Sequence, residues 1–291
     1  MMKETKKDHL SKIALIGVCV VGIGNFAYTA ANKPSNDISV QVAGELIKNN
    51  QLITNAAAKE FIGKTAAQYI IDNPQVLVTA SQKLEEKESQ INVQKIVDSK
   101  DALLDDKVTP YAGRKDAKVV VIEFFDYNCH FCQNVTPTIK KLISNNTEIK
   151  FLFKEFPIFG QGSEAAAQMG LHSYNIGGVE GYQKYHEAMF SYAASKQAKD
   201  HTGTNISDAV SVAEQAGITS VITPEERQQY SMVVQTNQRL ASNLNIKGTP
   251  AFIIMPSENP LADQVITIPG AASYERLQKA INDVETKVRR N

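Results

Sequence analysis

The chain has 291 residues, of which 43% are hydrophobic and 21% charged, so it can bury a sizeable core and has room for roughly two domains. Lys plus Arg and Asp plus Glu number 31 each, which leaves no excess of the basic residues that nucleic-acid-binding proteins carry. The composition therefore argues against a nucleic-acid partner.

The start of the chain resembles an export leader. A Lys-rich stretch, MMKETKKDHLSK, precedes a largely apolar run, IALIGVCVVGIGNFAYTA, that ends in small residues. This pattern predicts a signal peptide over residues 1–31, cleaved near Ala30 or Ala31. A retained membrane anchor is the alternative, because a helix of about 17 residues already suffices to span a bilayer. We expect a periplasmic or cell-envelope protein.

The cysteines narrow the chemistry. Cys19 lies in the predicted leader, so an exported chain keeps only Cys129 and Cys132, in the motif C-H-F-C. A purely structural disulfide between them would contribute little stability, because the loop that it closes contains only two intervening residues. A zinc ribbon needs a second cysteine pair, and none exists. A lone C-x-x-C in an exported chain is typical of disulfide exchange, with neither metal nor cofactor. The remaining alternative is a metal site completed by one of three histidines: His172, His186 or His201.

Residues 38–105 follow a short linker, KPSND (33–37), and show no strand-like alternation, which predicts a small helical region. Asn73 as N-cap and Pro74 as first helical residue predict the start of one helix. Helices this short make a thin core, so self-association is expected, and packing on their own chain is the alternative. Three apolar residues fall seven positions apart: Leu77, Leu84 and Ile91.

The next segments predict a strand followed by a helix. The apolar run AKVVVIEFF (117–125) is typical of a strand buried on both faces. The helix that follows, 129–146, opens with C-x-x-C, takes Asp126 or Asn128 as its cap and bends at Pro137.

The remainder predicts further strands around a helical stretch. Residues 163–246 are helical, with a capping box in which Thr223 is the cap, Pro224 the first helical residue and Glu226 the reciprocal partner. Predicted strands cover 149–158, 248–255 and 264–270, and a predicted helix covers 273–288.

These elements in this order resemble the thioredoxin fold of the exported DsbA-type thiol:disulfide oxidoreductases. The resemblance rests on the strand before C-x-x-C, the proline-bent helix, the helical insertion and the triplet Gly-Thr-Pro at 248–250. It covers residues 107–290 and implies an α/β, thioredoxin-like fold with a helical insertion at about 163–246, preceded by a small all-α region. Residues 38–105 are similar in character to the N-terminal oligomerisation segments of exported disulfide isomerases, which implies a homo-oligomer.

The motif assigns different roles to its residues. Cys129 at the helix start is expected to be exposed and nucleophilic, because unpaired N–H groups and the helix dipole favour its thiolate. The dipole supplies up to ~2 kcal/mol, about 1.5 pKa units, so a strongly oxidising enzyme also needs contributions from His130 and from hydrogen-bond donors around the motif. A solvated bystander is the alternative for His130. In DsbA the His occupies the second intervening position, so the direction of the reaction stays open.

Cys132, one turn further, is expected to be the buried resolving thiol. The resemblance implies that Glu123, on the strand beneath, accepts its proton, and Asp126 is the competing candidate. An ion pair between Glu123 and Lys154 of the neighbouring strand is the alternative use of that carboxylate.

The resemblance also implies a cis peptide bond at Thr249–Pro250 that faces the motif, and an ordinary turn is the alternative. The Thr249 backbone would then pair with an extended client peptide, with Phe131 as a further client contact. Thr before the cis proline is similar to the isomerase members of the superfamily, which favours isomerase or mixed activity.

The expected partners are exported proteins that contain cysteines and a membrane-embedded oxidase or reductase. A function of another class is a non-catalytic chaperone or scaffold that uses residues 38–105. The histidines of the insertion are expected on the surface or in packing positions, and two tyrosines in the core or along a groove: Tyr182 and Tyr185.

Overall fold

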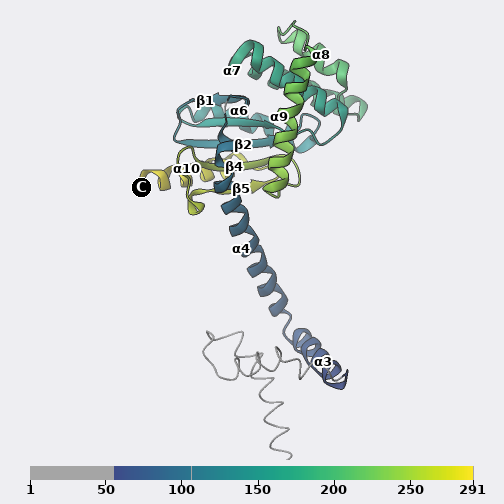
Figure 1. Ribbon diagram of the computed structural model, residues 1–291, viewed down its shortest axis with the longest axis vertical. Helices are drawn as coiled ribbons and strands as arrows, with labels where there is room; N and C mark the ends of the chain where they lie inside the picture. Colours follow the sequence, from purple (N-terminus) through teal and green to yellow (C-terminus); the bar gives the residue numbers. More distant parts are fainter. Residues whose placement is uncertain (1–55, 106, 291) are drawn as a thin grey trace, which may run out of the picture. The chain divides into compact units, whose positions relative to one another are not determined.

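The computed structural model describes residues 56–105 and 107–290 (Figure 1). The predicted leader and the linker at 33–37 lie outside these described residues. The chain divides into two units, Met1–Lys83 and Leu84–Asn291, of which the second carries C-x-x-C. Within the described ranges, no helix is both long and apolar enough to span a bilayer.

The described part of the N-terminal region is helical. Asn73 does not cap the helix after it, because its side-chain amide donates to the Tyr69 carbonyl at 2.9 Å and so closes the preceding helix. The apolar residues at sevenfold spacing remain 48–57% exposed. The helices are α3 (Ala56–Asp72), α4 (Gln75–Asp98) and α5 (Lys100–Leu104).

Five strands form one sheet in the order β1-β3-β2-β4-β5. The two central strands β2 and β3 run parallel and all other pairs are antiparallel. All seven positions of β2 are buried, which confirms the strand predicted to be covered on both faces. The edge strand β1 was not predicted, because three residues are too few for a periodic pattern. The strands are β1 (Tyr111–Gly113), β2 (Val119–Phe125), β3 (Lys150–Glu155), β4 (Ala251–Pro256) and β5 (Ile266–Pro269).

Helices cover both faces of the sheet. Successive side chains of a strand point to opposite faces, and in β2 both sets are buried in a core. Val119 and Val121 belong to the larger core, together with α6, α7 and α10. Val120 and Ile122 belong to a second core with α5, α9 and the end of α4. The covering helices are α6 (His130–Asn145), α7 (Gln161–Asp200), α8 (Ile206–Gln215), α9 (Pro224–Asn243) and α10 (Tyr274–Arg290), and a short 3-10 helix spans Ala262–Gln264.

The helical insertion between β3 and β4 is confirmed as α7, α8 and α9 (Figure 1). Helix α9 begins with the predicted capping box, in which Thr223 Oγ1 accepts from the Glu226 N–H and the Glu226 carboxylate accepts from the Thr223 N–H. Helix α7 is interrupted at Gly178, whose φ of 59° lies in the left-handed region that favours glycine. After α9 the chain enters β4, and Thr249, just before this strand, contacts Cys129 of the motif.

Candidate active site

Cys129 occupies the N-cap position of α6, at the end of the turn that leaves β2. Neither Asp126 nor Asn128 caps this helix, contrary to the prediction. The Asp126 carboxylate accepts from the N–H groups of Asn128 (2.8 Å), Ile158 (2.7 Å) and Phe159 (3.1 Å). It therefore joins the turn before the motif to the segment after β3.

Asn128 fastens the same turn to the insertion. Its amide donates to Ser163 Oγ at 2.9 Å, and its Oδ1 accepts from the N–H (2.7 Å) and hydroxyl (2.9 Å) of Thr204. This role was not expected from the sequence, since the only local signal is a polar residue directly before the motif. The backbone around Cys129 is thus held from two sides.

Both thiols of the motif are free, and both are buried, with 3% exposure for Cys129 and 0% for Cys132. The expectation of an exposed nucleophile was wrong in this respect. The pKa of Cys129 is lowered to about 6, first because its thiolate accepts a hydrogen bond from the Cys132 thiol, next by the Thr249 side chain, and further by the N–H groups of Cys132 and Phe131. Burial opposes this shift.

The pKa of Cys132 is shifted in the opposite direction. Burial, followed by the hydrogen bond that it donates to Cys129, raises its pKa above the ordinary value for a thiol. At neutral pH the site therefore holds one thiolate and one thiol, as the assignment of nucleophile and resolving cysteine requires.

His130 is exposed and hydrogen-bonds through Nε2 to the Asn134 amide at 3.0 Å. The interactions that lower the pKa of Cys129 come from elsewhere, as described above. A contribution of His130 to the thiolate stays a prediction.

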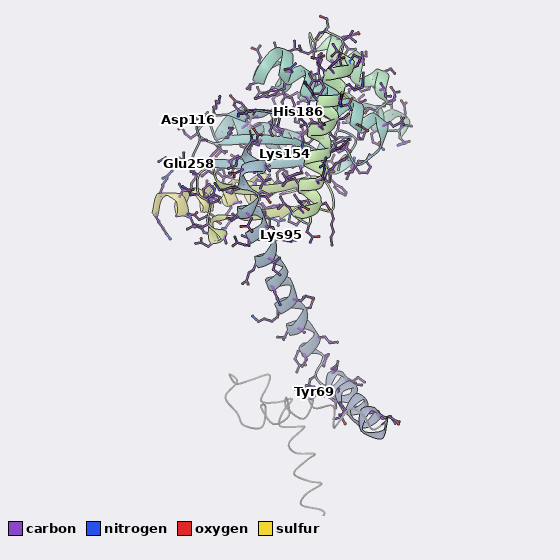
Figure 2. The ribbon with its side chains drawn as sticks, in the orientation of Figure 1. Tyr69, Lys95, Asp116, Lys154, His186 and Glu258 are labelled. Atoms are coloured by element: carbon purple, nitrogen blue, oxygen red, sulfur yellow. The ribbon has the colours of Figure 1, made fainter. Side chains whose placement is uncertain are left out.

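Glu123 is buried on the face of β2 that α6 covers. Its pKa is raised to about 8, first by burial and then by the negative charge of Cys129. The alternative ion pair with Lys154 is absent, because Glu123 pairs in register with Phe153, and the next side chain of β3 points to the opposite face. Lys154 donates instead to the Ala102 carbonyl (2.9 Å) and Thr109 Oγ1 (2.8 Å) (Figure 2).

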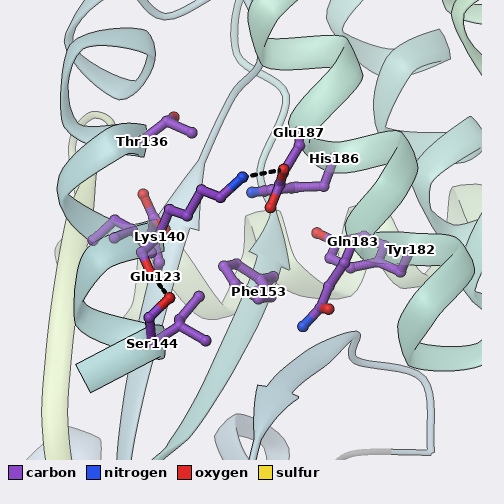
Figure 3. A pocket seen from close by; sticks show the side chains of 11 residues that line it. Glu123, Thr136, Lys140, Ser144, Phe153, Tyr182, Gln183, His186 and Glu187 are labelled. Carbon is purple, nitrogen blue, oxygen red and sulfur yellow. Dashed lines mark hydrogen bonds and ion pairs between the residues drawn. The ribbon is translucent and has the colours of Figure 1, made fainter. Parts of the chain in front are cut away.

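A cavity of about 180 Å³ connects Glu123 with the surface between α6 and α7 (Figure 3). It has room for several waters at roughly 30 Å³ each. Lys140 and Glu187, both exposed, form an ion pair of 2.7 Å across it. Glu123 therefore lines a route to water, and its charge interacts with the charges of Cys129 and Cys132. The other lining residues include Thr136, Ile139, Ser144, Phe153, Tyr182 and His186.

The Thr249–Pro250 peptide bond is cis, as expected, and it faces the motif. Cys129 Sγ lies 3.2 Å from the Thr249 carbonyl oxygen, to which it donates in its thiol form. The buried Oγ1 of Thr249 has no nitrogen or oxygen partner among the described residues. Segments more than a hundred residues apart thus form the two halves of one site.

Phe131 and Phe159 flank Cys129 on the side of the insertion. They are 62% and 56% exposed and line a hollow of about 570 Å³. The sequence analysis named Phe131 but not Phe159, whose position depends on the fold of the segment after β3. The remaining lining residues are Asn128, Cys129, His130, Gln197, Gly203 and Thr204.

The histidines of the insertion have structural roles. His186 is packed among aromatic rings, and burial lowers its pKa to about 3 (Figure 2). His172 bonds to the hydroxyls of Tyr230 (3.2 Å) and Ser220 (2.9 Å), and His201 is the left-handed C-cap of α7. In the part of the chain that the structure describes, no group of three candidate ligands could hold a metal ion.

A buried carboxyl that the sequence analysis missed lies at the end of β3. Glu155 accepts hydrogen bonds from the hydroxyls of Tyr127 (3.0 Å) and Tyr182 (3.1 Å), and burial raises its pKa well above the ordinary value. Tyr185 donates instead to the Ala166 carbonyl at 3.0 Å. Both tyrosines of the prediction are therefore core residues.

Comparison with known proteins places these features in a family. Residues 105–283, more than half of the chain, match the family model described as Thioredoxin. Disulfide bond formation protein D of Bacillus subtilis is 25% identical over 185 residues, which are 60% of this chain and 76% of that protein. A putative protein-disulfide oxidoreductase of Rickettsia felis is 24% identical over 273 residues, 87% of this chain and 90% of that protein.

Comparison with solved structures supports the same family. The crystal structure of Salmonella enterica Typhimurium BcfH is 27% identical and superposes with a TM-score of 0.63 over 84% of this chain and 99% of that chain. The chain belongs to the thioredoxin family and is a DsbA-like thiol:disulfide oxidoreductase.

Proposed function

We propose that the protein exchanges disulfides with other exported proteins and that its C-H-F-C motif carries the reaction. The observation behind the proposal is a Cys129 thiol with a pKa of about 6 that contacts the Thr249 carbonyl before a cis proline. A thiol with this pKa is mostly thiolate at neutral pH, and the thiolate is the nucleophile in exchange.

In the proposed reaction the Cys129 thiolate attacks one sulfur of a client cystine. A bond forms between these sulfurs, the client S–S bond breaks, and the departing sulfur leaves as a thiolate. Cys132 then loses its proton and attacks Cys129, which forms the Cys129–Cys132 disulfide and releases the second client thiolate. The client gains two electrons and the enzyme loses two. In reverse, the same steps place a disulfide in the client, and a membrane redox partner resets the pair.

Glu123 is the proposed acceptor of the Cys132 proton. In the mixed disulfide Cys129 has no charge, so one of the two causes that raise the pKa of Glu123 disappears at that stage. The carboxyl then ionises more readily when Cys132 must be deprotonated. The cavity beside it offers a path by which the proton leaves to water. Asp126 is less suited, because three backbone N–H groups already occupy its oxygens.

The decisive experiment uses two single substitutions. Cys132→Ser cannot resolve the mixed disulfide, so the variant should accumulate covalent complexes with other exported proteins that dissociate on reduction. Cys129→Ser, the matched control, should form none. A non-catalytic scaffold that acts through residues 38–105 would give no complexes with either variant, and that result would overturn the proposal.

Isomerase or mixed activity is the proposed direction, on the basis of Thr249 before the cis proline. Refolding of scrambled ribonuclease measures isomerisation, and oxidation of the reduced ribonuclease measures disulfide formation. Isomerase activity predicts recovery of scrambled ribonuclease, whereas a pure oxidase would act on the reduced form alone.

His130 is proposed to favour the Cys129 thiolate when its imidazole is charged. His130→Ala should then raise the pKa of Cys129 and make the disulfide a weaker oxidant. The reduction potential, measured against glutathione, tests this. An unchanged potential would make His130 a solvated bystander.

Self-association through residues 38–105 is proposed from the exposed stripe on α4, in which Leu77, Leu84 and Ile91 repeat at heptad spacing. Light scattering of the full chain and of a chain without residues 32–83, which keeps the core residues Ile96 and Leu103, should give an oligomer and a monomer. Replacing Leu77 and Leu84 with Lys should have the same effect as the deletion, whereas Gln82→Lys, off the stripe, should not. Monomers throughout would contradict the assignment.

Export to the periplasm or cell envelope is proposed from the leader-like residues 1–31. Cell fractionation and N-terminal sequencing of the purified protein would distinguish a cleaved signal from a retained anchor. A protein that starts at Met1 in the cytoplasmic fraction would contradict export.

A further inference from the structure

The last turns of α4 are part of the core beneath the cis-proline segment. Ile96 is 2% exposed and belongs to the cluster that contains Leu244 after α9 and Ile253 of β4. Val93 and Val97 of α4 pack against the same cluster. Full burial of an aliphatic side chain such as Ile96 contributes ~1.5–3 kcal/mol, so this end of α4 is firmly docked.

A groove of about 420 Å³ lies between this helix end and the cis-proline segment. Asn92 and Ile96 contribute from α4, and Thr249 and Pro250 from the active-site loop. The rest of the lining comes from 244–248, the start of β4 and the end of β5, and much of it is apolar: Leu244, Ile246, Ala251, Ile268 and Pro269.

Thr249 links the groove to the reactive sulfur, since this residue lines the groove and its carbonyl oxygen lies 3.2 Å from Cys129 Sγ. Among the described residues, the Thr249 N–H donates to no other backbone group. An unpaired backbone segment can pair with an extended peptide in the manner of an added strand. A client chain joined to Cys129 would therefore meet Thr249 first and the groove next.

Asn92 is suited to that occupant. Its side chain is half-buried at the groove and has no hydrogen-bond partner in the described part of the chain. A carboxamide both donates and accepts, which matches the alternating N–H and C=O groups of an extended peptide. The neighbouring Ile96 and Leu244 suit an apolar client side chain.

We infer that Asn92 and Ile96 of α4 form one wall of the client groove and select extended, cystine-bearing segments with an apolar residue beside the cysteine. The inference rests on the proposed exchange activity and adds the helix before the catalytic fold to its substrate site. Asn92 acts here as a specificity-determining residue, because it lines the groove together with Thr249 but takes no part in the exchange.

The test compares a client-like substrate with one too small to reach the groove. The first is a cystine peptide with Leu beside the cysteine, and the second is bis(2-hydroxyethyl) disulfide. Asn92→Trp fills the groove, and Asn92→Leu replaces the amide with an apolar group of the same branched shape. Lys95→Trp adds the same bulk to an exposed position of α4 outside the groove and serves as the control (Figure 2).

For the peptide, Asn92→Trp should raise KM about tenfold with kcat unchanged, a factor that corresponds to about 1.4 kcal/mol of lost binding. Asn92→Leu should raise KM by a smaller factor, and Lys95→Trp should leave it unchanged. All three variants should exchange with the small disulfide at the wild-type rate.

Two results would overturn the inference. One is a peptide KM in Asn92→Trp equal to that of Lys95→Trp. The other is an equal loss of rate for both disulfides, which would place the damage in the redox centre. If the wild-type protein exchanges with neither substrate, the proposed function itself fails, so the two failures are distinguishable.

Discussion

The buried carboxyl of Glu123 makes folding depend on pH in a way that one substitution can isolate. Its pKa is raised from 4.5 to about 8 in the folded protein, mainly by burial. Between these values the folded state binds more protons than the unfolded state, so the unfolding free energy falls as the pH rises. The interval corresponds to a loss of about 5 kcal/mol at 1.36 kcal/mol per pKa unit.

Glu123→Gln removes this titration. The unfolding free energy of the variant minus that of the reduced wild type should therefore increase by about 5 kcal/mol between pH 4.5 and pH 8, and stay level beyond these limits. Urea unfolding at a series of pH values measures the difference. Any cost of burying an unpaired amide lowers the stability of the variant by a constant amount at every pH. Such a constant amount does not alter the prediction, which concerns how the difference in unfolding free energy changes with pH.

Two controls sharpen the assay. Glu258→Gln makes the same substitution at an exposed position and serves as the control for it (Figure 2). In a Cys129→Ser background the slope due to Glu123 should shrink, since the thiolate charge that also raises its pKa is gone. A Glu123→Gln difference that changes by less than about 1 kcal/mol over this range would refute the reasoning about a buried, neutral acid.

Three further predictions concern the site and its support. The alkylation rate of Cys129 by iodoacetamide should rise with pH around a midpoint near 6, and a midpoint above the ordinary thiol pKa would contradict the hydrogen bonds assigned to its thiolate. Thr249→Val should lower the recovery of scrambled ribonuclease relative to the oxidation of reduced ribonuclease, and an unchanged ratio would show that this residue does not set the direction. Gly170→Ala should lower the unfolding free energy measured in urea by roughly 1–3 kcal/mol, because the added Cβ would lie 2.6 Å from Glu155 Oε1 and 3.1 Å from the Tyr127 hydroxyl. An unchanged unfolding free energy would mean that these side chains move aside at little cost.

The sequence by itself identified the parts of the site that depend on local chemistry. The buried run before the motif predicted β2, and C-x-x-C at a helix start predicted a lowered pKa for Cys129. The resemblance carried by Thr249-Pro250 implied the cis peptide. These inferences succeeded because strand burial, helix termini and X-Pro geometry depend on a few neighbouring residues.

Tertiary structure decided what depends on register and on distant segments. The pairing of β2 with β3 put Glu123 and Lys154 on opposite faces of the sheet and so excluded their ion pair. The fold of the segment after β3 gave Asp126 two N–H donors and brought Phe159 beside the motif. Docking of α4 onto the second core brought Asn92 to the cis-proline groove. No periodicity within a single segment encodes such placements, because side-chain direction follows from strand register and from which helix covers which face.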